Sequence, residues 1–187
     1  ILIPDFGQTK FDNVVLNLGP FEQQFNENRP FFTEGTDLFS KGNLLYSRRI
    51  GQTPDLNLNI AENESVESPG AINLVNALKI SGRDKDGLGI GFLNAITEKT
   101  MATATNSDDD STRQVEVSPL TNYNVMVFDQ RFNQNSSVTF INTNVTRNGS
   151  FRDANVTGLL FDLNNKTNTY NLSGGLKSSS INDVENK

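Results

Sequence analysis

From about residue 71 onward, apolar residues alternate with polar or small ones along segments of about nine to twelve residues. Because successive side chains of a β-strand point to opposite faces of a sheet, this period of two indicates strands. Polar turn compositions interrupt the alternation near residues 84–87, 133–136 and 164–166. The sequence therefore predicts an all-β fold in which residues 71–177 form an antiparallel meander of six long strands.

The first predicted hairpin has two faces of different character. One face of its first strand is expected to carry Ile72, Leu74, Leu78 and Ile80. In its second strand, large apolar residues alternate with small ones such as Gly89 and Gly91. We interpret these glycines as a surface on which another segment packs closely. The polar residues 52–70 and 105–114 are expected to be loops.

Strands of this length exceed the five or six residues that are usual in sheets of soluble proteins. Long alternating strands joined by short polar turns are typical of outer-membrane β-barrels, and a soluble meander with one hydrated face is the alternative. Six strands are fewer than the eight of the smallest bacterial barrels, so the chain would form part of one. Its first or last strand should then pair with a missing segment or another chain, or be shielded by residues 1–55.

The composition excludes several classes of function. The net charge is -6 and the pI about 4.7, which disfavours a nucleic-acid-binding surface because phosphate contacts need clustered Lys and Arg. The chain has no Cys, His or Trp, which excludes disulfides, thiolate or imidazole metal sites and His-based catalysis. We expect no cofactor, no metal site and no catalytic residue. The run of residues 108–110 could bind a hard cation, but it lacks the spaced ligands of a calcium loop, and we favour a solvated loop.

The chain divides by composition into an N-terminal segment, residues 1–55, and a β-barrel portion, residues 56–187. Phe and Pro are frequent in the first, which we expect to be mostly irregular and to lie partly in the barrel lumen or across its end; a short helix could begin at Pro20. The chain begins without Met or a signal peptide and has no run of about 18 apolar residues. We expect it to be a fragment of a longer protein.

The densest group of charged and aromatic residues lies within the N-terminal segment. Its candidate binding residues are Arg29, Glu34, Asp37, Tyr46, Arg48 and Arg49. Arginine forks bind carboxylates or sugar hydroxyls, and aromatic rings stack on sugar faces, so one interpretation is a polar ligand site. The other, which we favour, is structural: the segment packs inside the barrel, and Arg29, Arg48 or Arg49 pair with Glu34, Asp37 or another carboxylate of the lumen. Glu34 and Asp37 could also act as paired carboxylates of a glycosidase.

Three stretches in fixed order carry a family resemblance, residues 4–8, 21–35 and 44–51, and residues 77–97 and 119–123 also fit. They resemble an uncharacterised bacterial family common in Bacteroidetes. Its members usually carry a domain similar to family-nine carbohydrate-binding modules, followed by a large domain expected to form an outer-membrane β-barrel. The first of these domains is missing here, so its ligand recognition is not carried over.

The resemblance implies a non-enzymatic fragment of an outer-membrane β-barrel in the cell envelope of a Gram-negative bacterium. It further implies a link to carbohydrate uptake or processing, with the membrane as the main partner and a carbohydrate as a ligand. The alternatives are a part of a carbohydrate-active hydrolase and a soluble β-rich carbohydrate-binding module.

Overall fold

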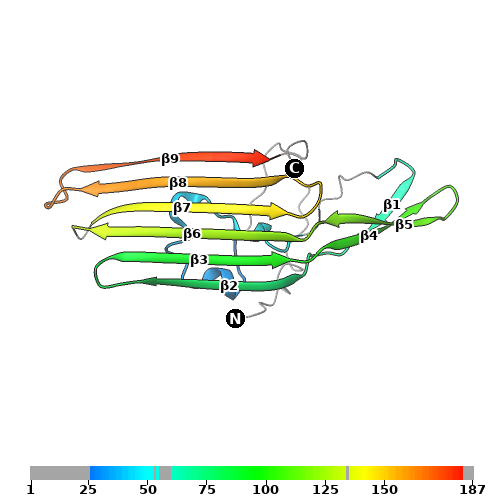
Figure 1. Cartoon of the computed structure of the whole chain (residues 1–187), viewed down its shortest axis with the longest axis horizontal. Helices are drawn as coiled ribbons and strands as arrows, with labels where there is room; N and C mark the ends of the chain where they lie inside the picture. Colours follow the sequence, from blue (N-terminus) through cyan, green and yellow to red (C-terminus); the bar gives the residue numbers. More distant parts are fainter. Residues whose placement is uncertain (1–25, 53, 55–59, 134, 183–187) are drawn as a thin grey trace.

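The computed structural model describes residues 26–52, 54, 60–133 and 135–182. The helix predicted to begin at Pro20 lies outside these residues. The chain forms a large sheet of six strands and a smaller sheet, which extends from one end of the large sheet in Figure 1. Among the described residues, no helix is both long enough and apolar enough to cross a membrane.

The large sheet has the strand order β2-β3-β6-β7-β8-β9, and every neighbouring pair is antiparallel. Its strands are β2 (Leu74–Arg83), β3 (Leu88–Thr97), β6 (Thr121–Phe132), β7 (Ser136–Arg147), β8 (Asp153–Asn164) and β9 (Asn171–Asn182). These are the six strands that the alternation predicts, and three of the loops between them fall at the predicted turns. The all-β fold with long antiparallel strands is therefore confirmed.

The smaller sheet corrects the prediction for two other segments. It consists of β1 (Glu64–Glu67), β4 (Thr100–Asn106) and β5 (Thr112–Ser118), in the order β1-β4-β5. Half of residues 105–114 and a part of residues 52–70 are thus strand, and the loop between β4 and β5 is shorter than expected. The alternation in β4 is between alanine and threonine, which lacks the large apolar residues that mark the other strands.

An ion pair explains why the polar strand β1 belongs to this small sheet. The Nε and Nη2 atoms of Arg113 in β5 donate hydrogen bonds of 2.6 and 2.7 Å to the carboxylate of Glu64. These bonds, with a further one from the backbone N–H of Ala61, lower the pKa of Glu64 to about 2. The pair spans from β5 to β1 across β4 and so ties the two outer strands together.

One face of the large sheet is covered by residues 26–52, which we call the docked segment; we call the covered face the inner face and the opposite one the outer face. The docked segment contains one short α-helix and two 3-10 turns, α1 (Pro30–Thr33), η2 (Lys41–Asn43) and η3 (Ser47–Arg49). Its buried apolar side chains pack with those of the inner face into a single core. The buried residues of this core are Phe31, Phe32, Leu38, Phe39, Ile50, Ala77, Leu93, Ala95, Val125, Val127 and Ile141.

A bulge in β2 corrects the predicted face of the first hairpin. The register with β3 shifts between Leu74 and Asn76, which places an extra residue in β2. Leu74 consequently packs against the core, whereas Leu78 and Ile80 point to the outer face and are exposed. The four apolar residues expected on one face are therefore divided between two.

Glycines on the inner face allow the docked segment to approach the sheet closely. A Cβ atom added to Gly91 would lie 3.1 Å from Cζ of Phe39, and one added to Gly89 would lie 2.8 Å from Cδ2 of Leu38. The interpretation of these glycines as a close-packing surface is confirmed. It also follows that these glycines share the covered face with Leu93 of β3, whereas Ile90 and Phe92 lie on the outer face.

We expect Gly91→Val to destabilise the docked segment by about 1–3 kcal/mol, because overpacking forces neighbouring side chains or backbone to move. Hydrogen exchange of the Ser40 amide, which donates to Thr36 O in the docked segment, measures this effect. Gly82→Val is the matched control, since a Cβ atom at Gly82 meets nothing within 4 Å. Equal exchange rates in the two variants would contradict close packing at Gly91.

Candidate functional site

Arg29 is the central residue of the docked segment, with only 1% of its surface exposed. Its Nε and Nη2 atoms donate hydrogen bonds of 2.8 and 2.7 Å to the two carboxylate oxygens of Glu27. Its Nη1 and Nη2 atoms also donate to the carbonyl oxygens of Ile50 and Ser47, at 2.7 and 2.8 Å. The guanidinium lies 4.3 Å from the centre of the Phe32 ring. Arg29 thus joins the beginning of the docked segment to its end.

The carboxylate of Glu27 is fully engaged within this arrangement. Besides the side chain of Arg29, it accepts hydrogen bonds from the backbone N–H of Arg29 at 3.0 Å and from the hydroxyl of Ser47 at 2.7 Å. Burial alone would raise the pKa of Glu27, but the hydrogen bonds from Arg29 and Ser47 outweigh burial and hold the pKa below its usual range. Glu27 is therefore a structural anion that stays charged at neutral pH.

A second charged cluster surrounds Asp129 of β6, whose side chain is completely buried. Arg83 of β2 forms an ion pair with it, and the hydroxyl of Thr139 in β7 donates a hydrogen bond of 2.5 Å. Lys41 of the docked segment and Arg131 of β6 each place a nitrogen 3.7 Å from its carboxylate. Asp129 consequently links three strands of the large sheet to the docked segment.

Two lysines of the large sheet bind backbone carbonyl groups of the docked segment. Nζ of Lys79 in β2 donates to the carbonyl oxygens of Phe31 and Glu34, at the end of α1. Nζ of Lys177 in β9 donates to the carbonyl oxygen of Gly42 at 2.7 Å. Since a short helix leaves its last carbonyl groups without partners, these lysines complete hydrogen bonding that the docked segment cannot supply itself.

The six predicted site residues differ in their burial. Arg29 and Arg48 are buried, Tyr46 is half-buried, and Glu34, Asp37 and Arg49 are exposed. The guanidinium of Arg49 lies 5.7 Å from the centre of the Tyr46 ring. Arg29 is paired with a carboxylate, but with Glu27 rather than with Glu34 or Asp37. Their role in ligand binding stays a prediction.

Comparison with known proteins gives a family. The model of the family described as a domain of unknown function (DUF5916) matches residues 1–187. The chain belongs to this family. No curated protein and no solved structure matches the chain. The DUF5916 match agrees with the resemblance to an uncharacterised family, whereas the outer membrane, the bacterial group and the link to carbohydrates stay predictions.

A small cavity lies between the docked segment and strands β2 and β3 of this DUF5916 chain. Its volume is about 150 Å³, smaller than the roughly 300–1,000 Å³ of usual ligand sites. It is lined by Glu27, Phe32, Thr36, Phe39, Ser40, Leu45, Ser47, Lys79 and Leu93. Its two charged groups already bind partners within the protein, so the cavity offers a ligand hydroxyl groups and aromatic edges only.

The acidic residues of the β4–β5 loop are held by hydrogen bonds to their neighbours. Asp108 accepts a bond of 2.7 Å from the side-chain amide of Asn63, and Asp109 accepts bonds from Ser111. Within the part of the chain that the structure describes, no group of three or more acidic side chains is placed to hold a metal ion. The loop thus has a structural explanation in its own contacts.

Proposed function

We propose that this chain forms part of the wall of an outer-membrane β-barrel in a Gram-negative cell envelope, with the docked segment on the lumen side. In this role the chain is not an enzyme. Its outer face contacts lipid, and its inner face holds the docked segment in place.

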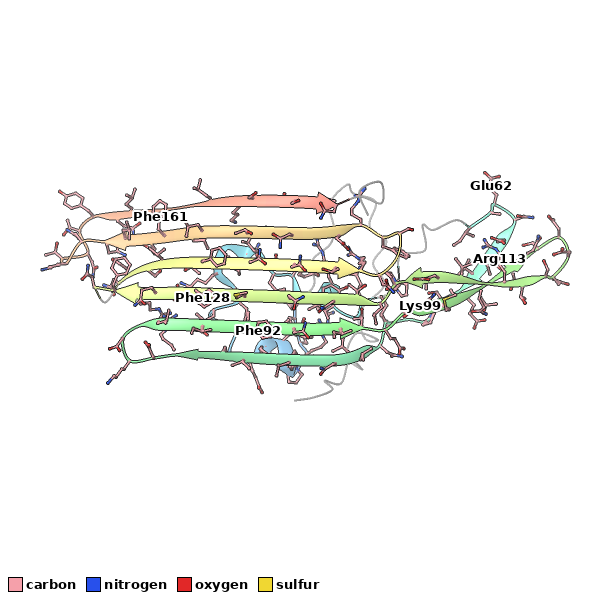
Figure 2. All side chains as sticks on the ribbon, viewed as in Figure 1. Glu62, Phe92, Lys99, Arg113, Phe128 and Phe161 are labelled. Carbon is pink, nitrogen blue, oxygen red and sulfur yellow. The ribbon has the colours of Figure 1, made fainter. Side chains whose placement is uncertain are left out.

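The observation that carries the proposal is the polarity of the large sheet. Seven large apolar side chains of the outer face are 39–75% exposed, although the inner face already buries an apolar core against the docked segment. The seven are Ile80, Ile90, Met126, Phe128, Phe140, Leu159 and Leu176. Figure 2 labels Phe92, Phe128 and Phe161 on three strands of this sheet. A soluble sheet buries its large apolar residues, whereas a membrane barrel directs them outward to lipid.

The charged clusters support a structural role for the docked segment. Glu27 and Arg29 satisfy each other, Asp129 is surrounded by cations of the protein, and the lysines bind backbone carbonyl groups. Charges of this kind are tolerated in a barrel lumen and are costly in hydrocarbon. Because their partners are already within the chain, they serve to hold the segment on the sheet.

The two edge strands of the large sheet support the idea that it is part of a larger one. Among the described residues, β2 pairs only with β3, and β9 pairs only with β8. Neither strand contains proline, which is a common protection of free edges, and every residue of β9 is exposed. We propose that both edges pair with further strands of the barrel, either from the same protein or from another chain.

Tryptophan fluorescence tests the proposal, because the chain contains no Trp of its own; any Trp in the rest of the full-length protein is first replaced by Phe. Phe140→Trp places the indole on the outer face, and Tyr123→Trp places it on the inner face. In the full-length protein in vesicles with brominated phosphatidylcholine, we expect the lipid to quench the fluorescence of the first variant strongly and that of the second weakly. Equal quenching of both, or failure of the protein to enter the vesicles, would refute a lipid-facing outer face.

A further inference from the structure

The outer face of the large sheet can be described by rows of residues that are paired in register across the strands. The asparagine row runs through Leu78, Asn94, Asn124, Asn144, Asn155 and Ser180. The mixed row lies two residues from the asparagine row in every strand. It runs through Ile80, Phe92, Met126, Asn142, Thr157 and Ser178. The apolar row runs through Gly82, Ile90, Phe128, Phe140, Leu159 and Leu176.

The boundary between polar and apolar residues crosses these rows diagonally. In β2 the boundary lies between Asn76 and Leu78, so Leu78 of the asparagine row is already on the apolar side. In β3 and β6 it lies between the asparagine row and the mixed row. In β7, β8 and β9 it lies between the mixed row and the apolar row. The boundary therefore moves by two rows from one edge of the sheet to the other. One residue is an exception, because Ile96 of β3 is apolar but lies on the polar side of the boundary.

The polar side of the boundary carries two groups of hydrogen-bonded amide and hydroxyl side chains, one across β3 and β6 and one across β7 and β8. The side-chain amide of Asn94 donates to Oδ1 of Asn124 at 2.8 Å, and that of Asn142 donates to Oγ1 of Thr157 at 2.8 Å and to Oδ1 of Asn155 at 3.1 Å. A carboxamide has more donors and acceptors than these bonds satisfy, so the rest need water or lipid headgroups. In hydrocarbon, these remaining donors and acceptors would have no hydrogen-bond partners, which costs free energy.

The angle of the boundary can be compared with the geometry of barrels. Two rows correspond to about 14 Å along the strands, and five strand spacings to about 24 Å across them, so the boundary makes an angle of roughly 30° with the rows. Strands of outer-membrane barrels are tilted by about 35–45° from the membrane normal. A level membrane surface would therefore cut the sheet along nearly this diagonal.

We infer that the diagonal boundary marks the surface of the hydrocarbon layer, so that acyl chains cover Leu78 and Ile80 at one edge while Ser178 and Ser180 of the same rows lie in the headgroup or aqueous region. This inference rests on the proposed function and adds to it the tilt of the strands and the depth of each row. It also assigns the asparagine-rich part of the outer face to the polar side of the membrane surface.

Single cysteines test the inference, because the chain contains no Cys; any Cys in the rest of the full-length protein is first replaced by Ser. The variants are Leu78→Cys and Ser180→Cys in the asparagine row, Ile80→Cys and Ser178→Cys in the mixed row, and Phe140→Cys in the apolar row. The full-length protein in phosphatidylcholine vesicles is treated with a water-soluble maleimide present on both sides of the membrane. Hydrocarbon raises the pKa of a thiol, and each unit lowers the reactive thiolate about tenfold.

We expect the cysteines at positions 178 and 180 to react at least about tenfold faster than those at positions 78, 80 and 140. Similar rates for both members of each row, with position 140 protected, would overturn the diagonal boundary and leave the barrel intact. Rapid reaction at all five positions would overturn the proposed function as well. Slow reaction at 178 and 180 would place these serines in hydrocarbon or under a partner, and would overturn the inference too.

Discussion

Arg29→Ala is expected to lower the free energy that holds the docked segment on the sheet by about 3 kcal/mol or more, because it leaves the partly buried Glu27 carboxylate without its main partner. It also removes the hydrogen bonds to the carbonyl groups of Ser47 and Ile50 that close the segment on itself. Hydrogen exchange of the Ile50 and Ser40 amides, both hydrogen-bonded within the segment, measures the loss in the full-length protein. A loss of this size corresponds to a change of about a hundredfold in protection.

Two further variants separate charge from shape at this site. Arg29→Lys keeps the positive charge but cannot replace the planar fork, so we expect an intermediate loss of protection. Arg49→Ala changes an exposed arginine of the same segment. It should change the free energy of opening of the Ser40 amide by less than about 0.5 kcal/mol. If Arg29→Ala left the Ser40 amide as protected as Arg49→Ala does, the hydrogen bonds of Arg29 would not be what holds the docked segment on the sheet.

The fold of the large sheet could be predicted because its strands combine large apolar residues at a period of two with strong turn compositions. The small sheet could not, since Ala102 and Ala104 alternate with threonine and give no large apolar signal. The acidic run beside them further suggested a loop. The bulge at Leu74 was also hidden, because it depends on pairing with β3 and not on the local sequence.

The alternation shows which residues share a face, but not which face is covered. Ile90 and Phe92 of β3 have large apolar side chains, and yet Gly91 between them faces the docked segment. The decisive factor is space, because Leu38 and Phe39 of the docked segment occupy the positions that side chains at Gly89 and Gly91 would fill. The predicted close packing on glycine carried this information, although its consequence for the outer face needed the structure.

The sequence identified the charged segment but not its partners. Glu27 could have been noticed from its spacing of two residues from Arg29, which suits a local ion pair. Asp129 could have been noticed because it continues the inward-facing alternation of Tyr123, Val125 and Val127. Its pairing with Arg83 and Lys41 depends on strand register and on the position of the docked segment, which sequence spacing does not give.

Asp129→Ala is expected to have an effect as large as that of Arg29→Ala, about 3–5 kcal/mol, because it removes a fully buried carboxylate from between three cations. Arg83 is 20% exposed and would lose its ion pair, while Lys41 and Arg131 would repel it without compensation. Since Arg83 lies in β2 and Thr139 in β7, the loss should extend across the sheet and not stay within the docked segment. Hydrogen exchange of the β6 and β7 amides measures the loss in the sheet, and that of the Ser40 amide measures the loss in the docked segment.

Lys41→Met provides the matched comparison for this cluster. Lys41 is 29% exposed and its nitrogen is 3.7 Å from the Asp129 carboxylate, so its loss should cost less than about 1 kcal/mol. Because Lys41 belongs to the docked segment, this variant should lower protection at Ser40 and leave β6 and β7 unchanged. Asp129→Asn keeps the shape without the charge and should fall between the two. If Asp129→Ala and Lys41→Met had equal effects confined to the docked segment, Asp129 would serve only to hold that segment and would contribute nothing to the pairing of the strands.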